Sequence, residues 1–184
     1  MSTQPPPNAS RGASRAPAPL GPAADYNARI LWPLARYVEE RFGRSGLQET
    51  AAAAGLEASD LDGKNRWISA EAFEGFLARA RAFMTDDDEF KRACAYRIKE
   101  AYGPMRYVLW AASPGAVFGL TVKTYHLVST VGKPSAVAQD RTHFHMRIES
   151  DGRPISRLNC LMRQAQCSAL PTLWGLPAAH VRED

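Results

Sequence analysis

The chain has 184 residues, of which 45% are apolar and 23% charged, a composition that suits one soluble globular domain. Its net charge of +4 is spread over both signs, which excludes the clustered lysines and arginines of a nucleic-acid surface, and no apolar run approaches a membrane-spanning length. Three cysteines, Cys94, Cys160 and Cys167, are too few for a disulfide framework and favour a cytoplasmic location.

The first 24 residues differ in composition from the rest of the chain. They are mostly proline, alanine, serine and glycine, and they contain no acidic residue. Such a segment cannot bury enough apolar surface to offset the entropy that it loses on ordering. We therefore predict a disordered tail over 1–24 and one folded domain over 25–184.

The folded domain is predicted to begin with helices. Apolar residues with the spacing of one helix face appear near its start: Ile30, Leu31, Leu34, Val38 and Phe42. Pro33 fits best in the first turn of this helix, and Gly43 is expected to end it. A short helix over 46–54 follows, and two more are predicted over 70–84 and 86–102.

The next segment, 101–131, is the most apolar part of the chain. Its pattern predicts two helices, which begin at Pro104 and Pro114 because a first helical turn tolerates the missing N–H of proline. Its only charged residues are Arg106 and Lys123. We therefore expect this segment to lie in the core of the protein.

A change of period then predicts two strands, over 135–139 and 142–149. In the second strand apolar and polar side chains alternate, as in a strand with one buried face. A last helix is predicted over 155–170 and a further strand at about 178–181. The fold class is therefore α+β, with a helical layer packed on a small antiparallel sheet. Because two strands alone are marginally stable, we expect other strands or a partner to complete the sheet.

Candidate metal and redox residues are sparse. His143 and His145 share one face of a predicted strand, with Cys160 or Cys167 as further ligands, but that face is otherwise charged and typical of a solvated surface. His126 is a candidate haem ligand without a supporting motif. The two cysteines are interpreted as core residues, with redox sensing as the alternative. No nucleophile stands at a recognisable spacing from a base, so we predict neither a cofactor nor an enzymatic activity.

Aromatic side chains in the apolar helices are candidates for lining a ligand pocket, with nearby cations as contacts for an anionic group. The candidate ligand-binding residues are Arg106, Tyr107, Trp110, Lys123, Tyr125 and Arg163. The alternative is that these aromatic residues pack in the core. Residues 45–63 resemble a helix-turn-helix, but Glu57, Asp60 and Asp62 would repel phosphates, so we expect no direct binding of nucleic acid by this segment.

A resemblance to a known family is carried by motifs in this order: GLEASDL (55–61), WISAEAFEGFLARA (67–80), FKRACAYRIKEAYGPMRYVLWAASPGAV (90–117), KTYHLVSTV (123–131), the hairpin, RLNCLMRQAQ and LPTLWGLPAAHV. With them, residues 27–181 resemble the N-terminal ligand-sensing region of AraC-type transcription regulators of the arabinose-binding-like group. Related stretches precede histidine kinases and nucleotide cyclases in some bacteria. The layout is also distantly similar to haem-NO-binding and vinyl-reductase-like sensor folds.

The resemblance implies a bacterial sensory domain that binds a small molecule or a protein signal, forms a homodimer and controls an output module. We expect that output module on a longer natural chain or on a partner protein. Our predicted dimer interface is Ile30, Leu31, Leu34 and Val38. The alternatives are an interaction adaptor without a small ligand and a metal- or haem-dependent sensor.

Overall fold

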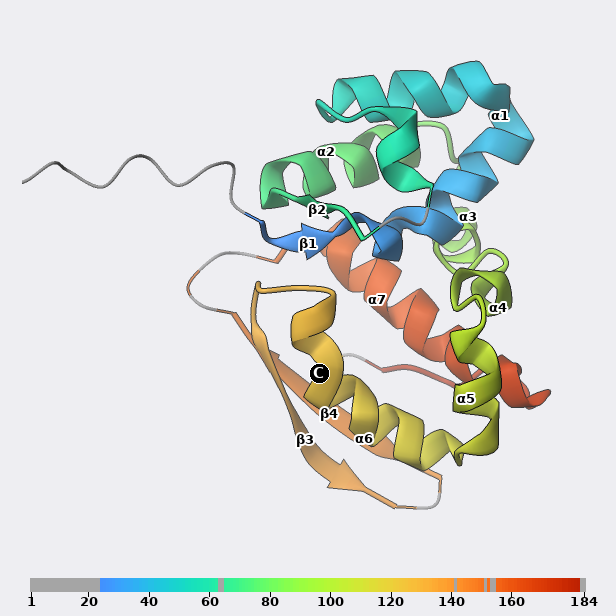
Figure 1. Ribbon diagram of the computed structural model, residues 1–184, viewed down its shortest axis with the longest axis vertical. Coiled ribbons are helices and arrows are strands. Elements are labelled where there is room, and N and C mark those ends of the chain that lie inside the picture. The colour runs from blue at the N-terminus through green and yellow to red at the C-terminus, as the bar shows by residue number, and fades with distance from the viewer. Residues whose placement is uncertain (1–23, 63–64, 141, 151, 153–154, 183–184) are drawn as a thin grey trace, which may run out of the picture.

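The computed structural model describes residues 24–182 except 63–64, 141, 151 and 153–154, so the predicted tail lies outside the described residues apart from Ala24. The chain forms a helical part and, below it in Figure 1, a smaller part built on a hairpin. The helical part contains β1 (Tyr26–Asn27), the 3-10 helix η1 (Ala28–Leu31), α1 (Trp32–Ala53), η2 (Ala58–Leu61), β2 (Trp67–Ile68), α2 (Ala70–Arg81), α3 (Asp87–Cys94), α4 (Ile98–Ala101) and, much later, α7 (Arg157–Ala169). The hairpin part contains α5 (Met105–Ala111), α6 (Pro114–Thr124), η3 (Tyr125–Leu127), β3 (Lys133–Gln139) and β4 (Phe144–Glu149), with η4 (Leu170–Trp174) against α5.

The predicted α+β class is confirmed, but the strands form two separate antiparallel sheets of two strands each. β1 pairs with β2, and β3 pairs with β4 from Lys133 opposite Glu149 to Gln139 opposite Phe144. The strand predicted at 178–181 is wrong, because residues 176–182 have no regular structure. Within the described part of the chain the hairpin gains no third strand, and α6 packs against it instead.

The helix boundaries follow from local chemistry. Pro33 occupies the first turn of α1, and Gly43, with a φ of 77°, interrupts the helix between its two halves, as predicted. Ser69 caps α2 by accepting a hydrogen bond from the N–H of Ala72 at 3.2 Å. The helix predicted over 86–102 is divided into α3 and α4 at Arg97, whose φ is 47° and whose guanidinium pairs with a carboxylate of α1.

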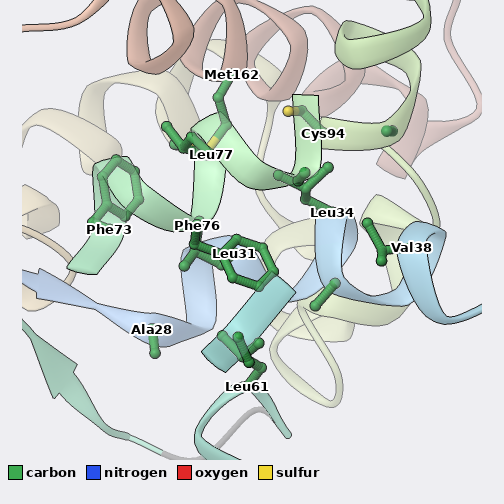
Figure 2. Close-up of a cluster of buried hydrophobic side chains, with 14 of the residues drawn as sticks. Ala28, Leu31, Leu34, Val38, Leu61, Phe73, Phe76, Leu77, Cys94 and Met162 are labelled. Carbon is green, nitrogen blue, oxygen red and sulfur yellow. The ribbon is translucent and has the colours of Figure 1, made fainter. Parts of the chain in front are cut away.

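The main core lies between α1, α2, α3 and α7. Figure 2 shows Leu31, Leu34 and Val38 directed into this core, together with Phe76 and Leu77 of α2. These side chains are at most 1% exposed. The apolar pattern of the first helix is therefore the pattern of a core element.

The predicted dimer interface is wrong for this reason. Leu31, Leu34 and Val38 are covered by their own chain, and two folded copies cannot meet through buried side chains. Ile30 is only half-buried, but it packs against the same core cluster. The four residues stabilise the single domain.

The prediction that 101–131 forms the core is also wrong. Only Leu109, Val117, Ser129 and Val131 of this segment are buried. Leu109 and Val117 join Leu170 in a second, smaller cluster beneath α5 and α6. These short helices cover little more than this cluster, so their outer faces are exposed.

A buried amide connects three elements of the helical part. Asn159 of α7 is completely buried, and its side-chain N–H groups donate to Tyr26 Oη at 3.0 Å and to Glu74 Oε1 at 3.2 Å. Tyr26 of β1 also stacks on Phe73 of α2, with ring centroids 4.0 Å apart. Because buried polar groups are costly without partners, these bonds hold α7 in one position against β1 and α2.

A buried carboxylate joins α1 to α3. Glu89 accepts hydrogen bonds at 2.8 Å from the N–H and the hydroxyl of Thr85 and from Tyr37 Oη. These donors, led by the backbone N–H of Thr85, lower the pKa of Glu89 to about 2, and Arg41 adds a favourable charge at 3.5 Å. Glu89 is therefore ionised in the folded protein over most of the acidic range.

We predict that Leu34→Ala destabilises the folded monomer rather than separating two subunits. The free energy of unfolding should fall by about 2–5 kcal/mol, because the change leaves a cavity in a packed core. Chemical denaturation followed by circular dichroism measures this loss. Leu127→Ala, at a side chain that is 56% exposed, is the control and should cost less than about 0.5 kcal/mol. Equal effects of the two variants would contradict the burial of Leu34.

We predict that Glu89 contributes stability above about pH 5, and that this contribution disappears as the pH falls towards 2. The reason is that its pKa of about 2 in the folded protein lies below the value of about 4.3 in an unfolded chain. The difference in free energy of unfolding between the wild-type and Glu89→Gln proteins should therefore shrink in acid. The exposed Glu71→Gln is the control, and a difference for Glu89→Gln that does not change with pH would disprove the assignment.

Candidate functional site

Exposed apolar side chains gather on α5, α6 and η3. Most of the large apolar residues that the described chain leaves exposed lie there: Met105, Tyr107, Val108, Trp110, Leu120 and Leu127. We call these residues, together with Arg106 of α5 and Lys123 of α6, the α5–α6 surface. Single exposed apolar side chains are normal, but such a concentration makes these helices the candidate site for contact with another molecule.

The geometry of α5 explains its exposed side. Leu109 packs into the small cluster over η4, and Trp174 of η4 donates its indole N–H to the carbonyl of Ala112 at 2.8 Å. One side of this short helix is therefore fixed to η4. The pairs Met105 with Val108 and Tyr107 with Trp110 are three residues apart, so their side chains are neighbours on the remaining surface of the helix. Trp110 is 66% exposed.

α6 lies on the hairpin and exposes one large apolar side chain, Leu120. Its Phe118 stacks on Phe144 of β4, with ring centroids 5.2 Å apart, and Gln139 of β3 donates to the carbonyl of Gly115 at 3.0 Å. These contacts fix the inner face of α6. Leu120 and Lys123 lie three residues apart on the outer face.

The charges of this surface have no carboxylate partners among the described residues. Arg106 lies over the ring of Tyr107, 4.7 Å from its centroid, and donates to Tyr107 Oη at 2.7 Å. Lys123 is exposed without an ion pair to any described residue. The helical part differs, because many of its arginines are paired with carboxylates: Arg36, Arg41, Arg44, Arg66, Arg79, Arg81, Arg97 and Arg157.

The predicted ligand-binding residues do not surround one cavity. Arg106 and Tyr107 contact each other and share the exposed side of α5 with Trp110, whereas Lys123 lies on α6. Tyr125 and Arg163 form a separate pair, with the guanidinium 5.3 Å from the centre of the ring. The six residues therefore belong to two places in the fold.

Arg163 has an incompletely satisfied guanidinium. Its Nε donates to Asn159 Oδ1 at 2.7 Å, and its Nη1 is buried without a hydrogen-bond partner. A buried donor without a partner is uncommon in folded proteins. This atom lies where α7 meets Tyr125 of the hairpin part, so an anionic group would be stabilised at that junction.

Two open grooves lie on the described part of the chain. One is polar and lies at the start of α3, between Arg81, Asp87 and Arg157. The other lies between α3 and α7, beside the segment that contains His180. Ser168 of α7 holds this segment through two hydrogen bonds with the backbone of Ala179. Neither groove contains the predicted ligand-binding residues.

The candidate metal ligands His143 and His145 and the candidate haem ligand His126 are all exposed. Exposed His143 lies 3.3 Å from Asp140, whose pKa is lowered to about 2 by the N–H groups of Thr142 and His143 in the hairpin turn. No group of three potential metal ligands occurs among the described residues, and His145 is exposed on β4. His126 is exposed on η3, with Nδ1 3.1 Å from the carbonyl oxygen of Lys123.

The three cysteines differ in burial: Cys94 is buried, whereas Cys160 and Cys167 of α7 are half-buried. Desolvation raises the pKa of the Cys94 thiol and also that of Cys167. Because only the thiolate reacts, a raised pKa makes a thiol less nucleophilic.

The sequence pattern did not identify the exposed apolar residues of the α5–α6 surface as a candidate site. Met105, Val108, Leu120 and Leu127 were assigned to the core by their apolarity, because nothing in their spacing shows how little core lies beneath them. One available signal was the lack of acidic residues over 101–139 combined with three cations, Arg106, Lys123 and Lys133, in the same segment. Such composition is also compatible with a binding surface.

Comparison with known proteins identifies no relative. No protein-family model matches the chain, and neither a curated protein nor a solved structure matches it.

Within the described part of the chain, no helix is both long and apolar enough to cross a membrane.

We predict that Cys94 does not react with iodoacetamide while the chain is folded, because its thiol is completely buried and its pKa is raised. Peptide mapping by mass spectrometry measures the labelling of each cysteine. Labelling in concentrated guanidinium chloride, where all three thiols should react, is the control. Rapid labelling of Cys94 in the native protein would contradict the packing of α3 against α1 and α7.

Proposed function

We propose that the protein is a non-enzymatic signal-transduction domain that acts by binding a partner protein through the α5–α6 surface. The observation that carries this proposal is the concentration of large apolar side chains on two short helices beside an otherwise well-covered core. A folded domain gains nothing by exposing Trp110 and Tyr107 unless another molecule covers them. Aromatic residues of this kind supply much of the binding energy at protein interfaces.

The open shape of the grooves supports a protein partner over a small substrate. Sites for small molecules are usually concave and bury most of the ligand, whereas protein interfaces are broad and comparatively flat. The exposed residues of the α5–α6 surface are spread over α5, α6 and η3, which suits a broad contact. This favours the adaptor alternative of the sequence analysis.

Sensing of a small anionic molecule is a second candidate function. It is favoured by the buried Nη1 of Arg163, which has no hydrogen-bond partner. A carboxylate or phosphate bound there would pair with the guanidinium and would contact the junction between α7 and η3. Such a ligand would couple its binding to the position of the hairpin part.

Homodimerisation and control of an output module remain part of the proposal through the resemblance to sensory domains of bacterial regulators. No residues are assigned to the dimer, because those predicted for it belong to the core. Light scattering of the purified protein measures the subunit number directly.

The proposed docking is tested with Trp110→Ser in cells of the source organism. In a gentle extract the wild-type protein, whose chain mass is 20.2 kDa, should co-elute with a second, different protein, and the variant should elute without that protein. Loss of one central aromatic side chain at an interface typically costs about 2 kcal/mol or more, which weakens binding at least ~30-fold.

Leu176→Ser is the matched control, because Leu176 is exposed, apolar and outside the α5–α6 surface. It should leave the assembly intact. Circular dichroism and thermal unfolding establish that both variants are folded. Identical elution of the wild-type protein and Trp110→Ser would reject the proposed function.

A further inference from the structure

The charge of the α5–α6 surface restricts what can cover it. Residues 101–139 contain the cations Arg106, Lys123 and Lys133 and no acidic residue. Each helix also places a cation beside an apolar side chain, because Arg106 precedes Trp110 by four residues and Lys123 follows Leu120 by three. A partner that covers the apolar groups must therefore also approach these cations.

A second copy of the chain fits this surface poorly. In a symmetric dimer the same patch meets itself, so the cations of one protomer approach those of the other. The patch contains no carboxylate with which to compensate them. Like charges brought together at an interface are unfavourable, and this disfavours self-association through α5 and α6.

An anionic membrane is also a weaker candidate than a protein. Membrane recognition by charge usually needs four to eight clustered lysines or arginines. The α5–α6 surface has only Arg106 and Lys123, and α5 is seven residues long. Interfacial membrane helices are generally longer and lie flat with a continuous apolar face.

We infer that the α5–α6 surface docks an amphipathic segment of a partner protein that carries carboxylates beside its apolar side chains. The apolar side chains cover Tyr107 and Trp110, and the carboxylates pair with Arg106 and Lys123. This inference rests on the proposed function and names the chemistry of its partner. The guanidinium of Arg106, held over the ring of Tyr107, is already oriented for such a pair.

The test uses two fluorescently labelled amphipathic helical peptides with the same leucine face, one flanked by glutamates and the other by lysines. Binding to the full chain is measured by fluorescence anisotropy at low and at physiological salt. The acidic peptide should bind at least ten-fold more tightly than the basic one, and added salt should reduce this preference. Equal binding of the two peptides, or binding of neither, overturns the inference.

The role of the two cations is tested with the double variant Arg106→Gln and Lys123→Gln. Its affinity for the acidic peptide should fall at least five-fold, whereas Arg106→Lys should retain most of the affinity. The matched control is Arg92→Gln with Lys99→Gln, which removes the same charge from exposed residues outside the α5–α6 surface. An equal loss in the control variant overturns the assignment to Arg106 and Lys123.

Two further outcomes separate this inference from the proposed function. The first is binding of the same protein to vesicles of phosphatidylcholine with phosphatidylglycerol. Binding to these vesicles but not to the acidic peptide overturns the inference in favour of a membrane. If Trp110→Ser disrupts the native assembly while neither peptide is preferred, the proposed function stands and the acidic partner is rejected. If the assembly is also unchanged, both proposals fail.

Discussion

The return of α7 to the helical part is the constraint on which the rest of the structure depends. α7 packs against α2 and α3 after the chain has passed through the hairpin part, and the buried amide of Asn159 fixes it there. Residues 102–156 therefore begin and end at elements that pack in the main core. Within these residues Leu109 and Val117 are buried against Leu170 of η4, whereas Val131 joins the main core. The outer faces of α5 and α6 are exposed as a consequence of this topology.

The two parts of the protein differ in how much apolar surface supports them. Phe73, Phe76 and Phe90 are completely buried in the helical part. Among the described residues, the separate cluster beneath α5 and α6 has only Leu109, Val117 and Leu170 as buried members. Regions with few buried contacts open at a lower free energy than the core. A partner that covers the exposed side of such a region stabilises it, because binding favours the ordered form. The proposed docking on α5 and α6 would therefore be coupled to the order of the hairpin part.

Local sequence patterns predicted where most of the helices and strands lie, but they did not predict which faces of these elements are buried. Gly43, Pro33 and Ser69 act on their own backbone neighbourhood, so their effects on helix boundaries could be read from the sequence. Whether Leu34 or Leu120 is buried depends on what folds over it, and apolarity alone does not contain that information. The same limit explains why the dimer interface was placed on core residues, and why the candidate ligand residues were grouped although Arg163 lies apart from Arg106.

The edges of the hairpin have a consequence for how the protein meets its neighbours. A two-stranded sheet has an open edge on each side, which is a template for adding strands from other chains. β3 begins with Lys133 and Pro134, and its register shifts between Ala136 and Ala138. A charge, a missing backbone donor and a bulge each obstruct further strand pairing. The β3 edge of the hairpin is thus protected against edge-to-edge aggregation, so a neighbouring chain that approaches this edge meets side chains rather than a continuous row of unpaired backbone groups.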